Sequence, residues 1–149
     1  MTSTQNILLV EDNDDDAELT TMAFKEARIA NPIERVADGV DALDYLFARE
    51  KHADRAQAEL PAVVLLDLNL PRLGGLEVLA AVRSHPRTKY LPVVVLTSSN
   101  EDADRLGAYD QHANSYVRKP VDYDTFVAAA RQLGLYWSVL NLPPPATAG

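Results

Sequence analysis

Residues 63–71 read VVLLDLNLP: four apolar side chains in succession, then Asp67, then a stretch that ends at a proline. The apolar run is short and has no polar alternation, which is typical of a strand that is buried on both faces, as in a parallel sheet covered by helices. Four further short runs of this kind lie at residues 7–10, 33–37, 93–96 and 115–117. Together the runs predict five strands, and the run that ends before Asp67 is the third of them.

Segments of helical length separate these runs. Apolar residues mark the first three at three- and four-residue spacing, namely Leu19, Met22, Ala23, Phe24 and Ala27, then Val40, Leu43, Leu46 and Phe47, then Leu76, Leu79, Ala80 and Val82. The fourth, residues 101–112, is mostly polar, and the fifth begins near Asp122, a suitable N-cap. Strand and helix alternating five times predict a three-layer α/β fold. Residues 48–60 are charged, and we expect them to form an exposed loop or a frayed helix end.

The composition indicates a folded chain with an acidic surface. The 149 residues are 47% hydrophobic, which suits one domain with a core, and the formal net charge is -8. An acidic surface repels phosphate backbones and anionic lipids, so nucleic acid and membrane surfaces are disfavoured partners. The sequence has no cysteine, no basic leader and no apolar stretch of the length that spans a membrane, and we therefore expect a cytoplasmic protein.

Acidic side chains follow two of the predicted strands. Glu11 and Asp12 come directly after the first strand, and Asp67 comes after the third. In open α/β sheets the chemistry lies at the carboxyl ends of the strands, where the strand order reverses, and strands one and three are neighbours there in the flavodoxin-like order. We therefore expect the three carboxylates to converge. Converging carboxylates repel one another unless a cation is present, and Mg²⁺ prefers oxygen ligands, so the pattern predicts a Mg²⁺ site.

Two more polar residues are predicted at the same edge of the sheet. Thr97 follows the fourth strand and Lys119 follows the fifth. An ammonium at that place can pair with Asp67 and then with a phosphoryl group added to it, and a hydroxyl can donate to a phosphoryl oxygen. The acids at residues 14–16 we interpret differently, because they lie at the start of the first helix, where negative charge suits the helix dipole.

At these residues the sequence resembles the receiver domain of two-component response regulators. The matching stretches, in the right order and at suitable spacing, are ILLVEDN, VVLLDLNLP with the following GG, VVVLTSS and SYVRKP. The resemblance covers about residues 5–137 and implies a flavodoxin-like, doubly wound fold, with five parallel strands in the order 2-1-3-4-5 and five helices. We expect residues 1–149 to form a single receiver domain, with residues 138–149 as an extension that ends in a mobile, proline-rich tail.

The resemblance implies a chemical role for the residues at the sheet edge. Asp67 would be the phosphoacceptor, supplied by a histidine kinase that carries phosphohistidine. Glu11, Asp12 and Asp67 would bind Mg²⁺, together with the backbone carbonyl of Asn69. Lys119 would contact the phosphoryl group, so that positioning and charge neutralisation do most of the work. Such a protein would signal by changing shape and contacting other proteins, and would not be an enzyme in its own right.

Further roles are implied outside the metal and acceptor positions. Asn69 and Ser99 would tune the lifetime of the aspartyl phosphate. Thr97 and Tyr116 would form the switch that responds to it, although Tyr116 also fits an ordinary half-buried strand aromatic. The peptide bond that precedes Pro120 would be cis, which proline tolerates.

The carboxyl-terminal segment carries one more apolar stripe. Alternating four- and three-residue steps, the spacing of a helix–helix seam, connect Phe126, Ala130, Leu133, Trp137 and Leu140. The first half must cover the sheet, but the apolar residues beyond Leu135 exceed that need and favour a homodimer interface along the stripe, without Ala130. The alternative is that Gly134 ends the helix and folds these residues back. The ending is similar to that of stand-alone regulators that partner phytochrome-type kinases.

Two other functions fit parts of the pattern. A relay intermediate would pass its phosphoryl group to a histidine phosphotransfer protein with the same site residues, so this alternative stays open. A haloacid dehalogenase-like phosphohydrolase also uses an aspartate nucleophile and Mg²⁺, but it needs a second acid two residues further on, where this chain has Asn69. His52, His85 and His112 we interpret as surface residues rather than phosphodonors.

Overall fold

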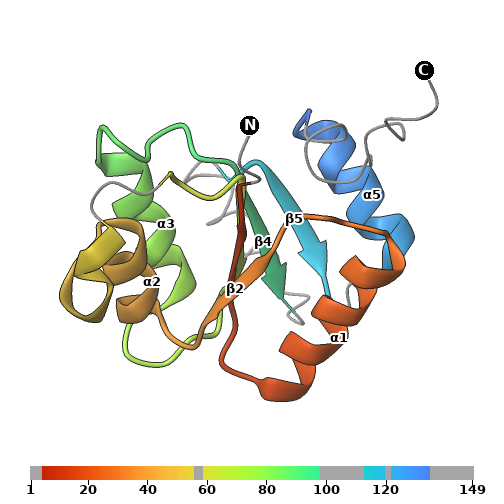
Figure 1. The fold of residues 1–149 in the computed structure, drawn as a ribbon, viewed down its shortest axis with the longest axis horizontal. Coiled ribbons are helices and arrows are strands. Elements are labelled where there is room, and N and C mark those ends of the chain that lie inside the picture. Colours follow the sequence, from red (N-terminus) through yellow and green to blue (C-terminus); the bar gives the residue numbers. More distant parts are fainter. Residues whose placement is uncertain (1–4, 56–58, 98–112, 120–121, 135–149) are drawn as a thin grey trace.

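The computed structural model describes residues 5–55, 59–97, 113–119 and 122–134, with only the backbone of Thr97 and Tyr123 (Figure 1). In this part of the chain, five strands pair in parallel in the order β2-β1-β3-β4-β5, which confirms the predicted doubly wound sheet. The strands are β1 (Ile7–Val10), β2 (Ile33–Val36), β3 (Val63–Asp67), β4 (Val93–Thr97) and β5 (Ser115–Arg118).

The helices of the described residues are α1 (Asp14–Glu26), α2 (Gly39–Leu46), the 3-10 helix η1 (Glu50–Arg55), α3 (Gly75–Ser84) and α5 (Tyr123–Gln132). The predicted fourth helix, residues 101–112, lies outside the described residues. The predicted cap of α5 is confirmed, because Asp122 Oδ1 accepts a hydrogen bond of 2.7 Å from the backbone of Thr125. Among the helices described, none is both long and apolar enough to cross a membrane.

The helices cover both faces of the sheet. Figure 1 shows α1 and α5 on one side of the strands and α2 and α3 on the other. Ile7 and Leu9 of β1 pack in the core with α1 and α5. The other two residues of β1, Leu8 and Val10, pack on the opposite face with α2 and α3. The rings of Phe24 and Phe126 join α1 to α5, with their centroids 4.3 Å apart. The three-layer prediction is therefore confirmed, and the sheet is buried on both faces.

The connection between α2 and β3 is more ordered than the sequence predicted. Part of it forms η1, which packs back on α2: the Arg55 guanidinium lies 3.5 Å from the centroid of the Tyr45 ring, and His52 Nε2 lies 2.8 Å from Asp41 Oδ1. The interpretation of His52 as a surface residue is therefore wrong, because it is half-buried in this packing.

The other two histidines differ in how far the structure tests them. His85 is exposed, as predicted, and its ring lies against that of Phe47 with the centroids 4.6 Å apart. His112 lies outside the described residues.

Candidate functional site

The carboxyl ends of β1 and β3 bring three acidic residues together. The parallel register sets Val10 opposite Leu66, so Glu11, which follows β1, and Asp67, the last residue of β3, lie at the same edge of the sheet. Glu11, Asp12 and Asp67 each offer a carboxylate oxygen there, and these oxygens lie within 4.8 Å of one another. The convergence that the sequence predicted is therefore confirmed.

Lys119 lies among these carboxylates. It follows β5, and its side chain is only 10% exposed. Its Nζ atom is 2.5 Å from Glu11 Oε1 and 2.9 Å from Asp67 Oδ2. The Glu11 and Asp67 residues are themselves buried, whereas Asp12 is exposed at the rim. Burial of these charges is tolerable because opposite charges face one another at short range.

The electrostatics of the site depend on burial and on this shared ammonium. Burial raises the pKa of Glu11 to about 7; the Lys119 ammonium opposes the rise and the neighbouring Asp67 adds to it. Burial alone would lower the pKa of Lys119, but its contacts with the carboxylates of Glu11, Asp67 and Asp16 outweigh burial and hold the pKa above its ordinary value. Lys119 is therefore charged at neutral pH, while Glu11 is poised to release a proton to solvent when a cation arrives.

The donor set fits a hard divalent cation. Its ligand atoms are carboxylate oxygens, which Mg²⁺ and similar ions prefer. Glu11 Oε1 is buried and has no partner with hydrogen-bond geometry, although the Lys119 ammonium is close to it. The residues present therefore make an acidic site for a divalent cation.

The hydrogen bonds of Asp67 hold both of its oxygens. Its Oδ1 atom accepts from the backbone N–H of Asn69 at 3.0 Å, and its Oδ2 atom accepts from Lys119 Nζ. Gly75, at the start of α3, lies against the backbone of Asp67, because a Cβ at Gly75 would come 2.3 Å from the Asp67 carbonyl oxygen. The carboxylate is thus held from the loop after β3 and by Lys119 after β5, while the start of α3 packs against the backbone of Asp67.

The structure describes only some of the predicted switch and lifetime-tuning residues. Thr97 ends β4 beside Arg118 of β5, but its side chain is outside the described residues. Tyr116 is half-buried on β5 and packs against the core that includes α2 and α3. Ser99 and Pro120 lie outside the described residues.

The predicted dimer stripe needs correction. Phe126 is buried inside the molecule against Phe24, so it cannot be an interface residue. Leu133 is half-buried, packs against the same core and caps α5. The helix ends at Gln132, before Gly134 at φ 70°, a left-handed conformation that glycine adopts readily. This is the helix end that the alternative predicted, and the last two residues of the stripe, Trp137 and Leu140, lie outside the described residues.

Sequence reasoning missed one residue of the site. The sequence alone places Asp16 among the acids that suit the helix dipole, but its Oδ2 atom accepts a hydrogen bond from Lys119 Nζ at 3.0 Å. A signal was available: Asn13 is a good N-cap, and side chains of a helix tilt toward its N-terminus, here toward the edge where β1 ends. The third residue after the cap therefore leans over the acidic cluster.

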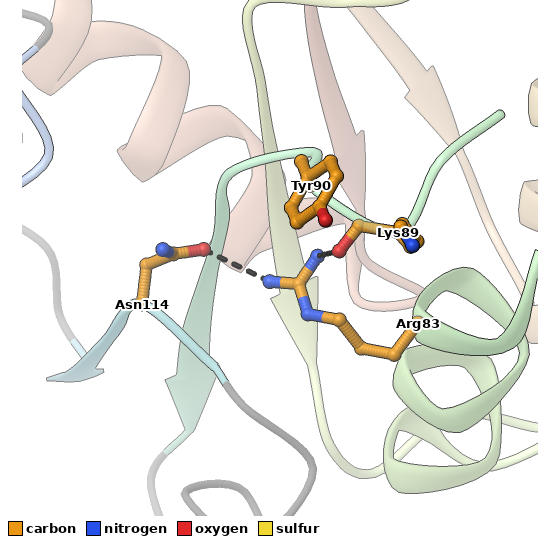
Figure 2. Close-up of a pocket in the computed structure, with 4 residues that line it drawn as sticks. All are labelled: Arg83, Lys89, Tyr90 and Asn114. Carbon is orange, nitrogen blue, oxygen red and sulfur yellow. Dashed lines mark hydrogen bonds between the residues drawn. The ribbon is translucent and has the colours of Figure 1, made fainter. Parts of the chain in front are cut away.

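A cavity of about 440 Å³ lies at the opposite edge of the sheet, and the hydrogen bonds of its lining residues have a structural role (Figure 2). Arg83, Lys89, Tyr90 and Asn114 line it. Arg83 donates to the carbonyl oxygen of Lys89 at 3.2 Å, to that of Leu91 at 2.6 Å and to Asn114 Oδ1 at 2.9 Å. Arg83 therefore braces the last turn of α3 against the chain that enters β4 and β5.

The fold and the acidic edge together define the class of this chain as a receiver domain of two-component signalling. The family model for the response regulator receiver domain matches residues 7–131, and the chain belongs to this family. Membership places the chain among signalling domains rather than among catalytic enzymes.

Three relatives show what the chain is similar to. The probable methanogenesis regulatory protein FilR2 of Methanothrix harundinacea is 41% identical over 138 residues, which are 93% of this chain and 86% of the relative. The solved structure of the bacteriophytochrome response regulator RtBRR is 46% identical, with a TM-score of 0.84 over 98% of this chain and 87% of that one. Response regulator Rcp1 of Synechocystis is 33% identical over 138 residues, 92% of each chain. The solved Mn²⁺-bound form of response regulator Rcp1 has a TM-score of 0.75, over 95% of this chain and 99% of that one.

Proposed function

We propose that this chain accepts a phosphoryl group from a histidine kinase on Asp67 and signals the event by changing shape. The observation that carries the proposal is the buried Asp67 carboxylate, whose Oδ2 atom lies 2.9 Å from the Lys119 ammonium beside Glu11 and Asp12. A carboxylate is a suitable nucleophile when nearby positive charge offsets the charge of the incoming phosphoryl group.

The transfer step follows from the atoms at the site. A carboxylate oxygen of Asp67 attacks the phosphorus of phosphohistidine, a P–O bond forms as the P–N bond breaks, and the imidazole nitrogen leaves with the electron pair and takes up a proton. Lys119 neutralises charge on the phosphoryl oxygens, and the Asn69 N–H keeps the carboxylate oriented. The product is an aspartyl phosphate, which water later hydrolyses.

We assign the cation of this site as Mg²⁺. Glu11, Asp12 and Asp67 would hold it with their side chains, and Asn69 with its backbone carbonyl. Bound there, it would supply positive charge next to the phosphoryl oxygens. The acidic cluster and the Mn²⁺-bound form of the similar Rcp1 support this assignment.

The response to phosphorylation is assigned to Thr97 and Tyr116. Thr97 is the last residue of β4, and Tyr116 is half-buried on the neighbouring strand. In the proposed switch the Thr97 hydroxyl moves toward the phosphoryl group, and the Tyr116 ring turns into the space it leaves, which shifts an existing equilibrium. Asn69 and Ser99 are the proposed determinants of how long the phosphoryl group stays.

The proposed donor is a sensor histidine kinase of the phytochrome type. The support is the similarity to the bacteriophytochrome response regulator RtBRR. The proposed receiver core spans about residues 5–137. A homodimer remains a proposal for Leu133, Trp137 and Leu140.

The proposal is tested with Asp67→Asn, which removes the nucleophile and keeps the shape of the side chain. We expect the variant to melt like the wild type but to take up no phosphoryl group from a phosphorylated kinase or from acetyl phosphate. Undiminished labelling of the variant would refute the acceptor assignment. Repeated turnover of phosphate esters by the wild type would instead support a phosphohydrolase.

A further inference from the structure

The Lys119 ammonium has three N–H bonds and three carboxylates around it. Two of the carboxylates, Glu11 and Asp67, are buried residues that follow β1 and end β3. The third is Asp16, whose Oδ2 atom lies 3.0 Å from Nζ and comes from the first turn of α1. Asp16 is thus the carboxylate that reaches Lys119 from a helix rather than from a strand end.

The neighbouring acids of the same turn behave differently. Asp14 pairs with Arg35 at 2.8 Å, and its side chain is 90% exposed. Asp15 is exposed and lines the outer surface of α1 together with Glu18 and Leu19. The Asp16 side chain is only 38% exposed. All three acids suit the helix dipole equally, so the dipole does not explain why one of them turns toward Lys119.

The other two partners of Lys119 have competing uses during phosphoryl transfer. Glu11 is a proposed cation ligand, and an oxygen of Asp67 becomes part of the acyl phosphate. During the transfer, Glu11 would interact with the cation and Asp67 with the phosphoryl group, so both would hold Lys119 less strongly at the moment when it has to stay in place. Asp16 has no part in either bond, so it can hold the ammonium through the whole step.

We propose that Asp16 is a positioning residue that holds Lys119 Nζ beside the reacting oxygen of Asp67 while the phosphoryl group is transferred. The inference rests on the proposed function, because it assigns Asp16 a part in that same reaction. Asp16 touches neither the phosphorus nor the cation, and it acts through the lysine.

The experiment compares Asp16→Asn with Asp15→Asn in the full chain. Each variant removes one negative charge from the same helix turn, but only the first loses a contact with Lys119. Acetyl phosphate with saturating Mg²⁺ is the phosphodonor, so that docking to a kinase does not enter. We expect Asp16→Asn to lower the maximal uptake rate about two- to fivefold, the range for an ion pair with one partner at the surface. We expect Asp15→Asn to keep the wild-type rate, and Asp16→Glu to recover part of the loss.

A second measurement reports on Lys119 directly. The NMR signal of its ammonium protons should shift and exchange faster with water in Asp16→Asn, and should stay unchanged in Asp15→Asn. A role of Asp16 in helix stability alone would lower the melting temperature without selectively moving this signal.

The outcomes separate this inference from the proposed function. If Asp67→Asn still takes up phosphoryl groups at the wild-type rate, the proposed function fails. If Asp67→Asn is inert but the Asp16 and Asp15 variants give equal rates and equal ammonium signals, only the positioning role fails. A faster maximal rate in Asp16→Asn would also overturn it, because Asp16 would then restrain the lysine.

Discussion

Replacing Glu11 with glutamine keeps the shape of a buried side chain and removes its charge, and we expect the metal-free protein to become more stable at pH 8. Burial holds the pKa of Glu11 at about 7 instead of its ordinary 4.5. The folded state therefore binds this proton more tightly than the unfolded chain does. As a result, Glu11 makes stability fall as pH rises from about 4.5 to about 7, and its full cost is present above pH 7.

The magnitude follows from the two pKa values. Each pKa unit corresponds to about 1.4 kcal/mol, so ionised Glu11 costs the metal-free fold about 3 kcal/mol at pH 8 and about 1 kcal/mol at pH 5. Glu11 is 0% exposed, so water screens little of this cost. Glutamine stays neutral at both pH values and avoids it. The variant should therefore be more stable than the wild type by about these amounts.

The assay is urea unfolding at pH 5 and at pH 8, with a chelator present and then with Mg²⁺. Glu18→Gln, an exposed change on α1, is the control and should shift the free energy of unfolding by less than about 0.5 kcal/mol at either pH. Added Mg²⁺ should stabilise the wild type at pH 8 and leave Glu11→Gln almost unchanged. An equal difference between Glu11→Gln and the wild type at both pH values would refute the reasoning, because the cost would then not come from ionisation.

Three further outcomes follow from the same structure. Mg²⁺ affinity of the wild type should rise about tenfold per pH unit below pH 7 and level off above it, because the cation displaces the Glu11 proton; a titration series between pH 5 and pH 8 measures this. Gly75→Ala should lose about 1–3 kcal/mol of stability and weaken Mg²⁺ binding, because its Cβ would lie 2.3 Å from the Asp67 carbonyl oxygen. Gly74→Ala, whose Cβ meets nothing within 4 Å, is the control for both readouts. Phe126→Ala should cost about 3–5 kcal/mol in urea unfolding without changing self-association in sedimentation, since the ring lies in the core of the monomer.

The part of the site that could be predicted from the sequence depends on one geometric rule. Residues that follow neighbouring parallel strands meet at one edge, so two short apolar runs followed directly by Glu11 and by Asp67 are enough to place these acids together. The same rule predicted Lys119 after β5. These predictions need the order of the strands but no detail of any side chain.

Asp16 could not be placed by that rule because it lies on a helix. Which of three successive acids leans over the cluster depends on the residue at which α1 begins, and a shift of one residue turns each side chain by about 100°. The Asn13 cap fixes that start. Sequence patterns predict helix ends less well than helix positions, and here the end decided the contact.

The predictions for η1 and for the carboxyl-terminal stripe, both outside the acidic site, differ from the structure for separate physical reasons. The packing of η1 depends on the Arg55 guanidinium over the Tyr45 ring, a contact without sequence periodicity. The stripe in the carboxyl-terminal segment keeps its spacing across Gly134, but hydrophobic spacing does not report the left-handed conformation that ends α5 there. In both cases a single local contact or torsion overrode the pattern.

The brace that Arg83 forms with Asn114 and the carbonyl oxygen of Leu91 means that different kinds of contact hold the two ends of the sheet. The guanidinium of Arg83 joins the entry of β4 and β5 to α3 through hydrogen bonds to backbone carbonyl oxygens and to the amide oxygen of Asn114. At the exit of β5, Lys119 faces the carboxylates of Glu11 and Asp67, where a bound cation or an added phosphoryl group would change the charge. If phosphorylation displaces the exit of these strands, as proposed, we expect the entry that Arg83 holds to move less than the exit.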